Sequence, residues 1–239
     1  MPDDAGAVSF SYSNLSGRPP GRLVSLLARF LSGVREVQEH VEPYARAWEE
    51  RNAENVRRVA AGARWWAVLG DSMSQGIGAS APDRGWVGQL QDDVPLPRVN
   101  FSFNGARIVD VLDRQLPALE DLAVACRNKP ALVTLMIGSN DMNSRRGRGE
   151  ISTAMADLLH RVPRGTLVTT QPGAQGAALM VNHAIDDAAA AGRIRIAEFR
   201  VPDMRTWKGR LAADRFHPND AGYAAMADIV RHALRAPAV

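Results

Sequence analysis

The chain has 239 residues, of which 46% are hydrophobic and 23% are charged, and its formal net charge is +3. These values are typical of a globular protein, and the length is sufficient for one sizeable α/β domain with an extension. The single cysteine, Cys126, excludes an internal disulfide. Lysine occurs only at Lys129 and Lys208, no long basic run is present, and aromatic residues make up 6%, so we expect no nucleic-acid partner.

The N-terminal part of the chain contains a polar segment followed by a helical one. Residues 1–20 are rich in Ser, Gly and Pro, which predicts a flexible tail. Residues 21–61 show helical periodicity, and Pro43 disfavours helical backbone at Glu42, so we expect two helices or one kinked helix with a break near residue 42. An apolar seam recurs there at alternating steps of four and three residues: Leu23, Leu27, Phe30, Val34, Val37, Val41, Tyr44 and Trp48.

The sequence leaves several roles open for this apolar seam. It packs on the protein's own domain in one interpretation, and forms a homodimer contact or short coiled coil through residues 21–61 in another. A flap over an active site and a helix on a membrane surface are further alternatives. No apolar run reaches the roughly 18 residues of a membrane span, and Arg29 interrupts the stretch that looks most like a signal sequence. We therefore expect a cytoplasmic protein without a transmembrane segment, with secretion as the alternative.

From residue 63 onward, short apolar runs alternate with helical segments. The apolar runs predict strands at residues 65–70, 99–103, 131–138, 166–173 and 193–199. Helices are expected at about residues 84–92, 106–126, 150–162, 175–191 and 219–235, the last with Asn219 or Asp220 as its N-cap. This alternation predicts a mostly parallel sheet covered on both faces, in which ligands bind outside the carboxyl ends of the strands.

Chemically informative residues follow several of the predicted strands. The first strand leads into GDSMSQGIG, the second into an Asn-Gly pair, the third into GSND, and the fifth, after a longer loop, into DRFHPND. A serine hydroxyl needs a base to become a nucleophile, and His217 is a candidate base for Ser72. Asp214 lies three residues before His217, so one turn of chain can place its carboxylate on the other ring nitrogen.

An oxyanion formed on the substrate also needs hydrogen-bond donors. Candidate donors are the backbone N–H groups of Ser72 and Gly105 and the side-chain amide of Asn140. Glycine lets the backbone approach a ligand closely, and an asparagine amide is a neutral donor that does not compete as a base. These residues predict acyl transfer through a serine nucleophile.

Taken together, GDSMSQG, NFSFNGA, GSND and DRFHPNDAGY resemble, in order and spacing, the blocks of the SGNH (GDSL) hydrolase family over about residues 64–235. The resemblance implies a three-layer α/β/α flavodoxin-like domain with a mostly parallel five-stranded sheet at residues 63–239, preceded by a tail and helical extension at residues 1–62. It also implies a carboxylic ester substrate and no metal or cofactor. Met73 stands where leucine is usual, and Asn104 where a small serine is common. By position, the catalytic and oxyanion residues are Ser72, Gly105, Asn140, Asp214 and His217.

Simpler interpretations exist for each of these residues. Ser72 alone is a plausible helix cap, His217 a loop histidine, and Asn140 a turn residue, while Asp71 is expected to hold its turn by hydrogen bonds. A nucleotide-binding turn is disfavoured because the GDSMSQGIG turn contains neither a lysine nor a G-x-G-x-x-G pattern. The remaining alternatives to a lipid or small-ester hydrolase are a carbohydrate acetyl-esterase of the same family and a catalytically silent relative that binds partners through its N-terminal helices.

The segment MNSRRGRGE directly follows the GSND motif and contains three arginines. One interpretation is a solvated loop. The other is a positive rim that attracts anionic esters, formed by Arg145, Arg146 and Arg148.

Overall fold

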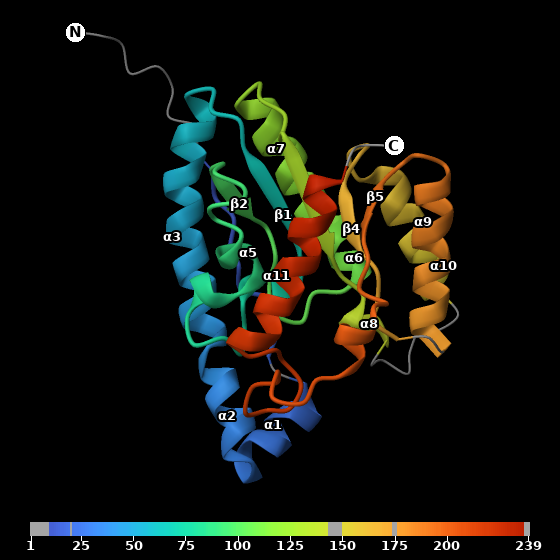
Figure 1. Ribbon diagram of the computed structural model, residues 1–239. Helices are drawn as coiled ribbons and strands as arrows, with labels where there is room; N and C mark the ends of the chain where they lie inside the picture. Colours follow the sequence, from blue (N-terminus) through green and yellow to red (C-terminus); the bar gives the residue numbers. More distant parts are fainter. Residues whose placement is uncertain (1–9, 20, 143–149, 174–175, 237–239) are drawn as a thin grey trace, which may run out of the picture.

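A five-stranded, all-parallel sheet lies at the centre of the computed structural model, which describes residues 10–19, 21–142, 150–173 and 176–236 (Figure 1). The strand order is β2-β1-β3-β4-β5, the flavodoxin-like order. This confirms the predicted fold class, and every strand overlaps the apolar run that predicts it. The strands are β1 (Trp66–Gly70), β2 (Arg98–Asn100), β3 (Leu132–Met136), β4 (Leu167–Thr169) and β5 (Arg195–Ala197).

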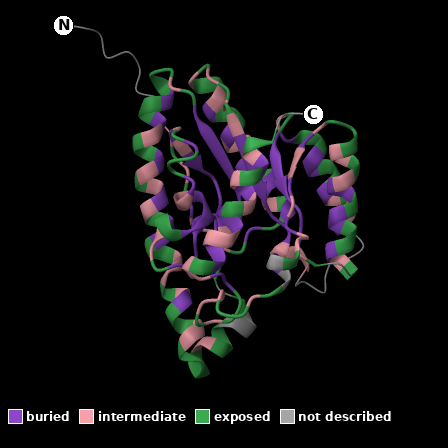
Figure 2. Ribbon diagram, in the orientation of Figure 1, coloured by how far each residue is buried: buried purple, intermediate pink, exposed green. Residues whose placement is uncertain are grey.

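Helices cover both faces of the sheet and bury almost all of its side chains (Figure 2). One face carries α5 (Trp86–Gln89) and α11 (Asp220–Arg235), and the other carries α7 (Leu116–Ala125), α9 (Ile151–Arg161) and α10 (Gly176–Ala190). Side chains alternate along β1, so Trp66 and Val68 join a core with α5 and α11, while Ala67 and Leu69 join a core with α7, α9 and α10.

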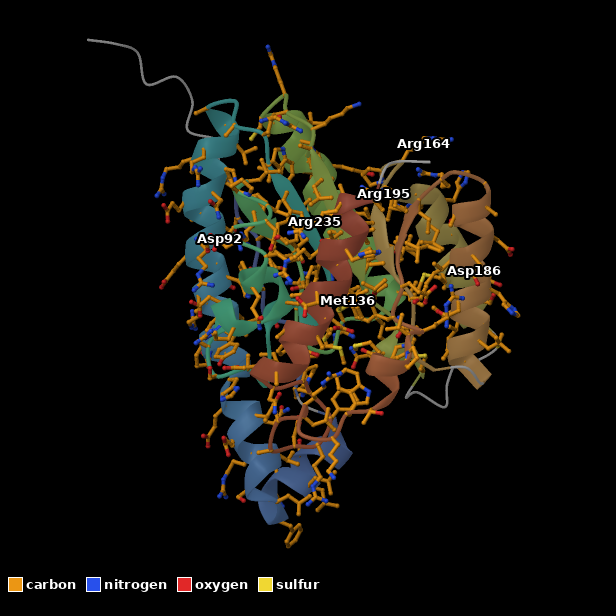
Figure 3. All side chains as sticks on the ribbon, in the orientation of Figure 1. Asp92, Met136, Arg164, Asp186, Arg195 and Arg235 are labelled. Atoms are coloured by element: carbon orange, nitrogen blue, oxygen red, sulfur yellow. The ribbon has the colours of Figure 1, made fainter. Side chains whose placement is uncertain are left out.

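Short helical segments connect these layers. Two of them, α4 (Ser72–Gln75) and α8 (Ser139–Met142), follow β1 and β3 directly and so lie at the carboxyl end of the sheet. In Figure 3, Met136, at the carboxyl end of β3, lies in the interior of the molecule. Arg195, at the start of β5, lies nearer the end of the molecule where the strands begin. The connecting segments are α4 (Ser72–Gln75), η1 (Pro82–Arg84), α6 (Ile108–Asp110), η2 (Val111–Gln115), α8 (Ser139–Met142) and η3 (Pro202–Arg205).

The N-terminal extension forms three helices: α1 (Arg22–Phe30), α2 (Ser32–Glu39) and α3 (Val41–Ala60). The predicted break lies at His40, and the expectation of non-helical backbone at Glu42 is wrong. Pro43 stands in the first turn of α3, where a backbone N–H has no helical partner to lose. A second break, at Leu31, was not predicted. None of the helices in the described part of the chain has the length and apolar character needed to cross a bilayer.

Burial differs along the described part of the apolar seam. Val37, Tyr44 and Trp48 are covered by the rest of the chain, whereas Phe30 is 78% exposed. The buried part therefore packs on the protein's own domain. In α1, by contrast, the seam residues Leu27 and Phe30 remain exposed to solvent.

Residues 10–19 pack against the outer edge of β2, so the prediction of a flexible tail is wrong for them. Asn14 is buried, and its side-chain amide donates to the backbone oxygens of Asn100 (2.9 Å) and Ser102 (2.7 Å). Tyr12 donates its hydroxyl to the backbone oxygen of Phe101 (2.5 Å). An edge strand leaves backbone groups unpaired, and these side chains satisfy them.

Candidate active site

Ser72 lies at the first turn after β1. Asp71 is the N-cap of α4 and accepts a hydrogen bond from the backbone N–H of Met73 (3.0 Å). The cap is therefore Asp71 and not Ser72, which leaves the serine hydroxyl available for another partner. Ser72 is buried, with 3% of its surface exposed.

His217 connects Ser72 to Asp214. The Nε2 atom of His217 lies 3.0 Å from the Oγ atom of Ser72, and its Nδ1 atom lies 2.6 Å from an oxygen of Asp214. The side chains of His217 and Asp214 are each only 7% exposed. The structure thus brings together the three residues predicted from sequence, although 145 residues separate Ser72 from His217.

The loop around Asp214 fixes the direction of its carboxylate. The second carboxylate oxygen accepts hydrogen bonds from the backbone N–H groups of Phe216 and His217, both at 3.0 Å. Burial alone would raise the pKa of Asp214, but the hydrogen bond and charge of His217 together with these amides hold the pKa below its ordinary value. Asp214 therefore remains a carboxylate at neutral pH.

A glycine next to the nucleophile turn lets His217 approach. Gly78 has a φ of 95°, and a Cβ atom on it would lie 2.7 Å from the Cβ atom of His217. The backbone N–H of Ala212 donates to the carbonyl of His217 (2.8 Å), which closes the loop from the other side. Asn219 then caps α11 by accepting from Gly222, as one of the two predicted N-caps.

Asn140 links the segments that carry the other candidate oxyanion donors. Its side-chain amide donates to the backbone oxygen of Ala106 (2.9 Å), next to Gly105, and makes a longer contact of 3.4 Å to Asp71, next to Ser72. Gly105 has a φ of 75°, a conformation that favours glycine. The three predicted donor residues therefore come from neighbouring segments at the carboxyl ends of β1, β2 and β3.

Two aspartates stabilise these turns. Asp71 accepts a hydrogen bond from the hydroxyl of Ser139 (2.6 Å), and its burial raises its pKa. Asp141 accepts from the backbone N–H of Ile108 (3.1 Å) and so ties α8 to the start of α6; burial raises its pKa to about 6. The sequence predicted the role of Asp71 in its turn but not the contact of Asp141, which depends on a partner 33 residues away.

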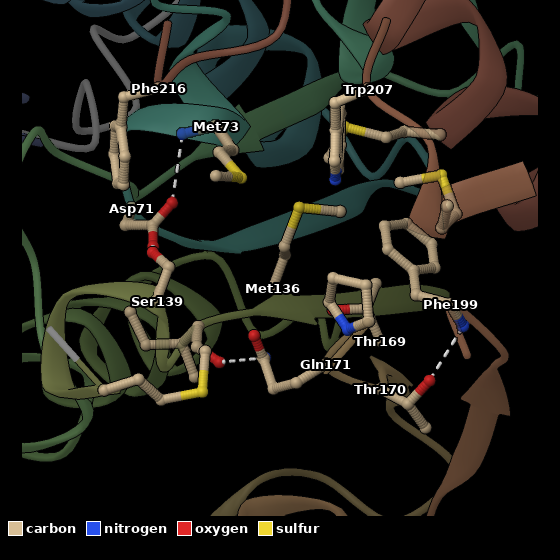
Figure 4. A pocket seen from close by; sticks show the side chains of 15 residues that line it. Asp71, Met73, Met136, Ser139, Thr169, Thr170, Gln171, Phe199, Trp207 and Phe216 are labelled. Carbon is tan, nitrogen blue, oxygen red and sulfur yellow. Dashed lines mark hydrogen bonds between the residues drawn. The ribbon is translucent and has the colours of Figure 1, made fainter. Parts of the chain in front are cut away.

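An apolar cavity of about 180 Å³ is lined by residues that are adjacent in the chain to Ser72 and His217 (Figure 4). Asp71 and Met73, on either side of Ser72, contribute to its wall, as does Phe216 beside His217. Sequence reasoning missed this cavity because its residues come from many separate segments. Its apolar lining is made mainly by Met73, Met136, Ile137, Met142, Pro172, Phe199, Met204, Trp207, Phe216 and Met226.

The predicted positive rim cannot be placed in the same way, because Arg145, Arg146 and Arg148 lie outside the described residues. Met142, the last described residue before them, lines the cavity. Within the described ranges, no group of three or more His, Cys, Asp and Glu side chains is arranged to hold a metal ion.

A parallel α/β sheet with a serine, a histidine and a carboxylate joined by hydrogen bonds at the carboxyl ends of its strands is typical of hydrolases. Residues 68–225 match the model of the GDSL-like lipase/acylhydrolase family. This match spans more than half of the chain, which therefore belongs to that family. No curated protein sequence matches the chain.

Solved structures share this fold. That of TesA has a TM-score of 0.60 and 21% sequence identity, covering 72% of this chain and 98% of the other. The psychrotrophic esterase EstA from Pseudoalteromonas sp. has a TM-score of 0.57 and 18% identity, covering 72% and 97%. A member of the lipolytic G-D-S-L family from Veillonella parvula has a TM-score of 0.57 and 21% identity, covering 71% and 97%. At these identities the similarity shows a shared fold.

Proposed function

We propose that the protein hydrolyses carboxylic esters through an acyl intermediate on Ser72. The observation that carries this proposal is the series of short contacts from Ser72 through His217 to Asp214, at 3.0 Å and 2.6 Å. If Asp214 accepts from Nδ1–H, then Nε2 of His217 has a free lone pair directed at the hydroxyl of Ser72.

The first half of the reaction transfers the acyl group to the enzyme. The Oγ atom of Ser72 attacks the ester carbonyl carbon while His217 takes the hydroxyl proton. The carbonyl oxygen becomes an oxyanion, to which the backbone N–H groups of Ser72 and Gly105 and the amide of Asn140 donate. The intermediate then collapses: the bond to the alcohol oxygen breaks, and His217 gives its proton to the leaving alcohol.

The second half of the reaction releases the acid. Water attacks the acyl-Ser72 carbonyl, His217 accepts a proton from the water, and collapse of the second tetrahedral intermediate returns a proton to the serine oxygen. Asp214 stabilises the protonated imidazole in both halves and is itself not protonated.

The apolar cavity beside Ser72 is the proposed site for the acyl chain. The cavity, of about 180 Å³, is larger than an acetyl methyl group requires, because one water-sized group needs only about 10–15 Å³ of such space. Each buried methylene contributes about 0.8 kcal/mol, or about a fourfold gain in kcat/KM. An apolar chain of medium length therefore fits better than an acetyl group.

Hydrolysis of p-nitrophenyl esters from acetate to palmitate tests the proposal. The rate is expected to rise from acetate to esters of medium chain length, and Ser72→Ala is expected to abolish the burst of p-nitrophenol and to lower kcat by at least about 1,000-fold. The matched control is Ser152→Ala, on α9. Activity that survives in Ser72→Ala contradicts the mechanism, and a maximum at acetate contradicts the acyl-chain assignment and favours an acetyl-esterase.

A further inference from the structure

The N-terminal helix α1 presents apolar side chains to solvent. Leu26 is 51% exposed, Leu27 37%, Phe30 78% and Leu31 50%. Three of these residues share one face of the helix at the i, i+1 and i+4 positions, and the fourth directly follows its last residue. Single exposed leucines are ordinary, but a contiguous group on one short helix marks an interaction surface.

Positive charge accompanies this surface. Residues 5–35 contain no aspartate or glutamate, whereas arginines occur at Arg18, Arg22, Arg29 and Arg35. Arg18 pairs with Asp110. Arg29 and Arg35 are exposed, and neither forms an ion pair with a carboxylate in the described part of the chain. Arg29 lies in the last turn of α1, so the apolar face has an uncompensated cation beside it.

The same surface lies next to the candidate active site. Figure 1 shows α1 and α2 beyond the carboxyl ends of the strands, at the end of the molecule that carries the site. Gly33 of α2 lies so close to the backbone of Ala213 that a Cβ atom would overlap the carbonyl oxygen, and Asp214 is the next residue. On the same loop Phe216 is 42% exposed and lines the apolar cavity.

We propose that α1 binds the surface of an anionic lipid bilayer, with Leu26, Leu27, Phe30 and Leu31 inserted among the acyl chains and the arginines at the headgroups. An amphipathic helix with cationic residues beside its apolar face binds in this way. Each arginine near an anionic surface contributes about fivefold to partitioning. Docking on α1 brings the loop of Asp214 and the mouth of the cavity toward the lipid.

A second copy of the chain fits this surface less well. In a two-fold dimer the same patch meets itself, so two sets of arginines would face each other with no acidic residue among residues 5–35 to neutralise them. Among the described side chains, the patch also has four large apolar ones, whereas a stable interface uses about 20–30 residues from each partner. An anionic bilayer removes both objections, because it neutralises the arginines and covers a small patch.

Cosedimentation with vesicles tests this proposal on the full chain. Vesicles of phosphatidylserine and phosphatidylcholine in equal amounts are expected to bind the protein at least tenfold more strongly than vesicles of phosphatidylcholine alone. Phe30→Ser is expected to weaken binding about tenfold and Arg29→Gln about fivefold. Val124→Ser, which changes a side chain that is 77% exposed on α7, is the matched control and is expected to bind as the wild type does.

Binding and catalysis can be separated in this experiment. Ser72→Ala is expected to bind vesicles like the wild type, so the outcome does not depend on the proposed ester hydrolysis. Phe30→Ser is expected to keep the wild-type rate on soluble p-nitrophenyl acetate, because the side chain is exposed and lies outside the site. Equal binding by wild type and Phe30→Ser overturns the proposal. A second result would also overturn it: the wild type is a dimer in light scattering, Phe30→Ser dissociates that dimer, and the wild type binds neither kind of vesicle.

Discussion

Replacement of Asp214 by asparagine isolates the contribution of its charge. Asparagine keeps an oxygen that can accept from the backbone N–H groups of Phe216 and His217, so the loop keeps its conformation. In the wild type, Nδ1 of His217 lies 2.6 Å from a carboxylate oxygen of Asp214. In the variant, the group at this position is either an uncharged amide oxygen or an amide N–H. An amide N–H at that position favours the imidazole tautomer that has its proton on Nε2, which cannot accept the proton of Ser72.

The size of the effect follows from the geometry. With a contact of 2.6 Å, the centres of charge of the carboxylate and of a protonated imidazole are about 4 Å apart. At an effective dielectric constant of about 20, two unit charges at that distance attract each other by about 4 kcal/mol, which corresponds to roughly 1,000-fold in rate. Asp214→Asn is therefore expected to lower kcat on a p-nitrophenyl ester about 1,000-fold with little change in KM.

The control for this variant is Asp187→Asn, which removes an exposed carboxylate from α10. It is expected to keep wild-type kinetics. Thermal unfolding of both variants establishes that they fold. A folded Asp214→Asn protein whose kcat falls less than tenfold would refute the argument, because the charge of Asp214 would then contribute less than about 1.4 kcal/mol to the transition state.

Asn140→Ala is expected to lower kcat on the order of 100-fold in the same assay, because it removes a donor to the oxyanion; a decrease below fivefold would exclude that role. Burial raises the pKa of Asp141 to about 6, so the wild type loses free energy of unfolding as the pH rises from about 4 to about 6 and the buried carboxyl ionises. Asp141→Asn has no such ionisation and is therefore expected to be increasingly more stable than the wild type over this range. The gain, about 1–2 kcal/mol after allowance for solvent screening, is measured by urea unfolding at pH 4 and pH 8, and an equal difference at both would contradict it. Joint replacement of Arg145, Arg146 and Arg148 by glutamine is expected to lower kcat/KM for anionic esters more than for neutral ones; an equal change would indicate a solvated loop.

The sheet and the central residues of the site were predictable because their signals are local. Buried parallel strands appear as continuous apolar runs, and Asp214 and His217 occur within one turn of chain. Some predicted strands extend past the carboxyl end of the observed strand, where the chain leaves the sheet to form the site. β4 ends at Thr169, and Thr170, Gln171 and Pro172, which the predicted strand includes, line the cavity instead.

The cavity and the N-terminal packing depend on contacts between distant residues. Met136 and Met226 have the composition of core residues, and the sequence does not show that they surround a space. Asn14 stands in a polar stretch that resembles any tail, and its burial depends on backbone groups at residues 100 and 102. Pattern reasoning detects periodicity and motifs, whereas these features arise from the tertiary arrangement.

The polar side chains along β2 have a consequence for the association of this protein with other chains. Asn52 accepts from the backbone N–H of Asn100 (2.8 Å) and donates to its oxygen (2.7 Å), and Asn55 donates to the oxygen of Arg98 (3.0 Å). Without α3, these groups would form a free strand edge, which is a template for pairing with a second sheet. A chain that lacks residues 1–62 is therefore expected to self-associate, as gel filtration would measure. The N-terminal extension thus occupies backbone groups of β2 to which another strand could otherwise pair.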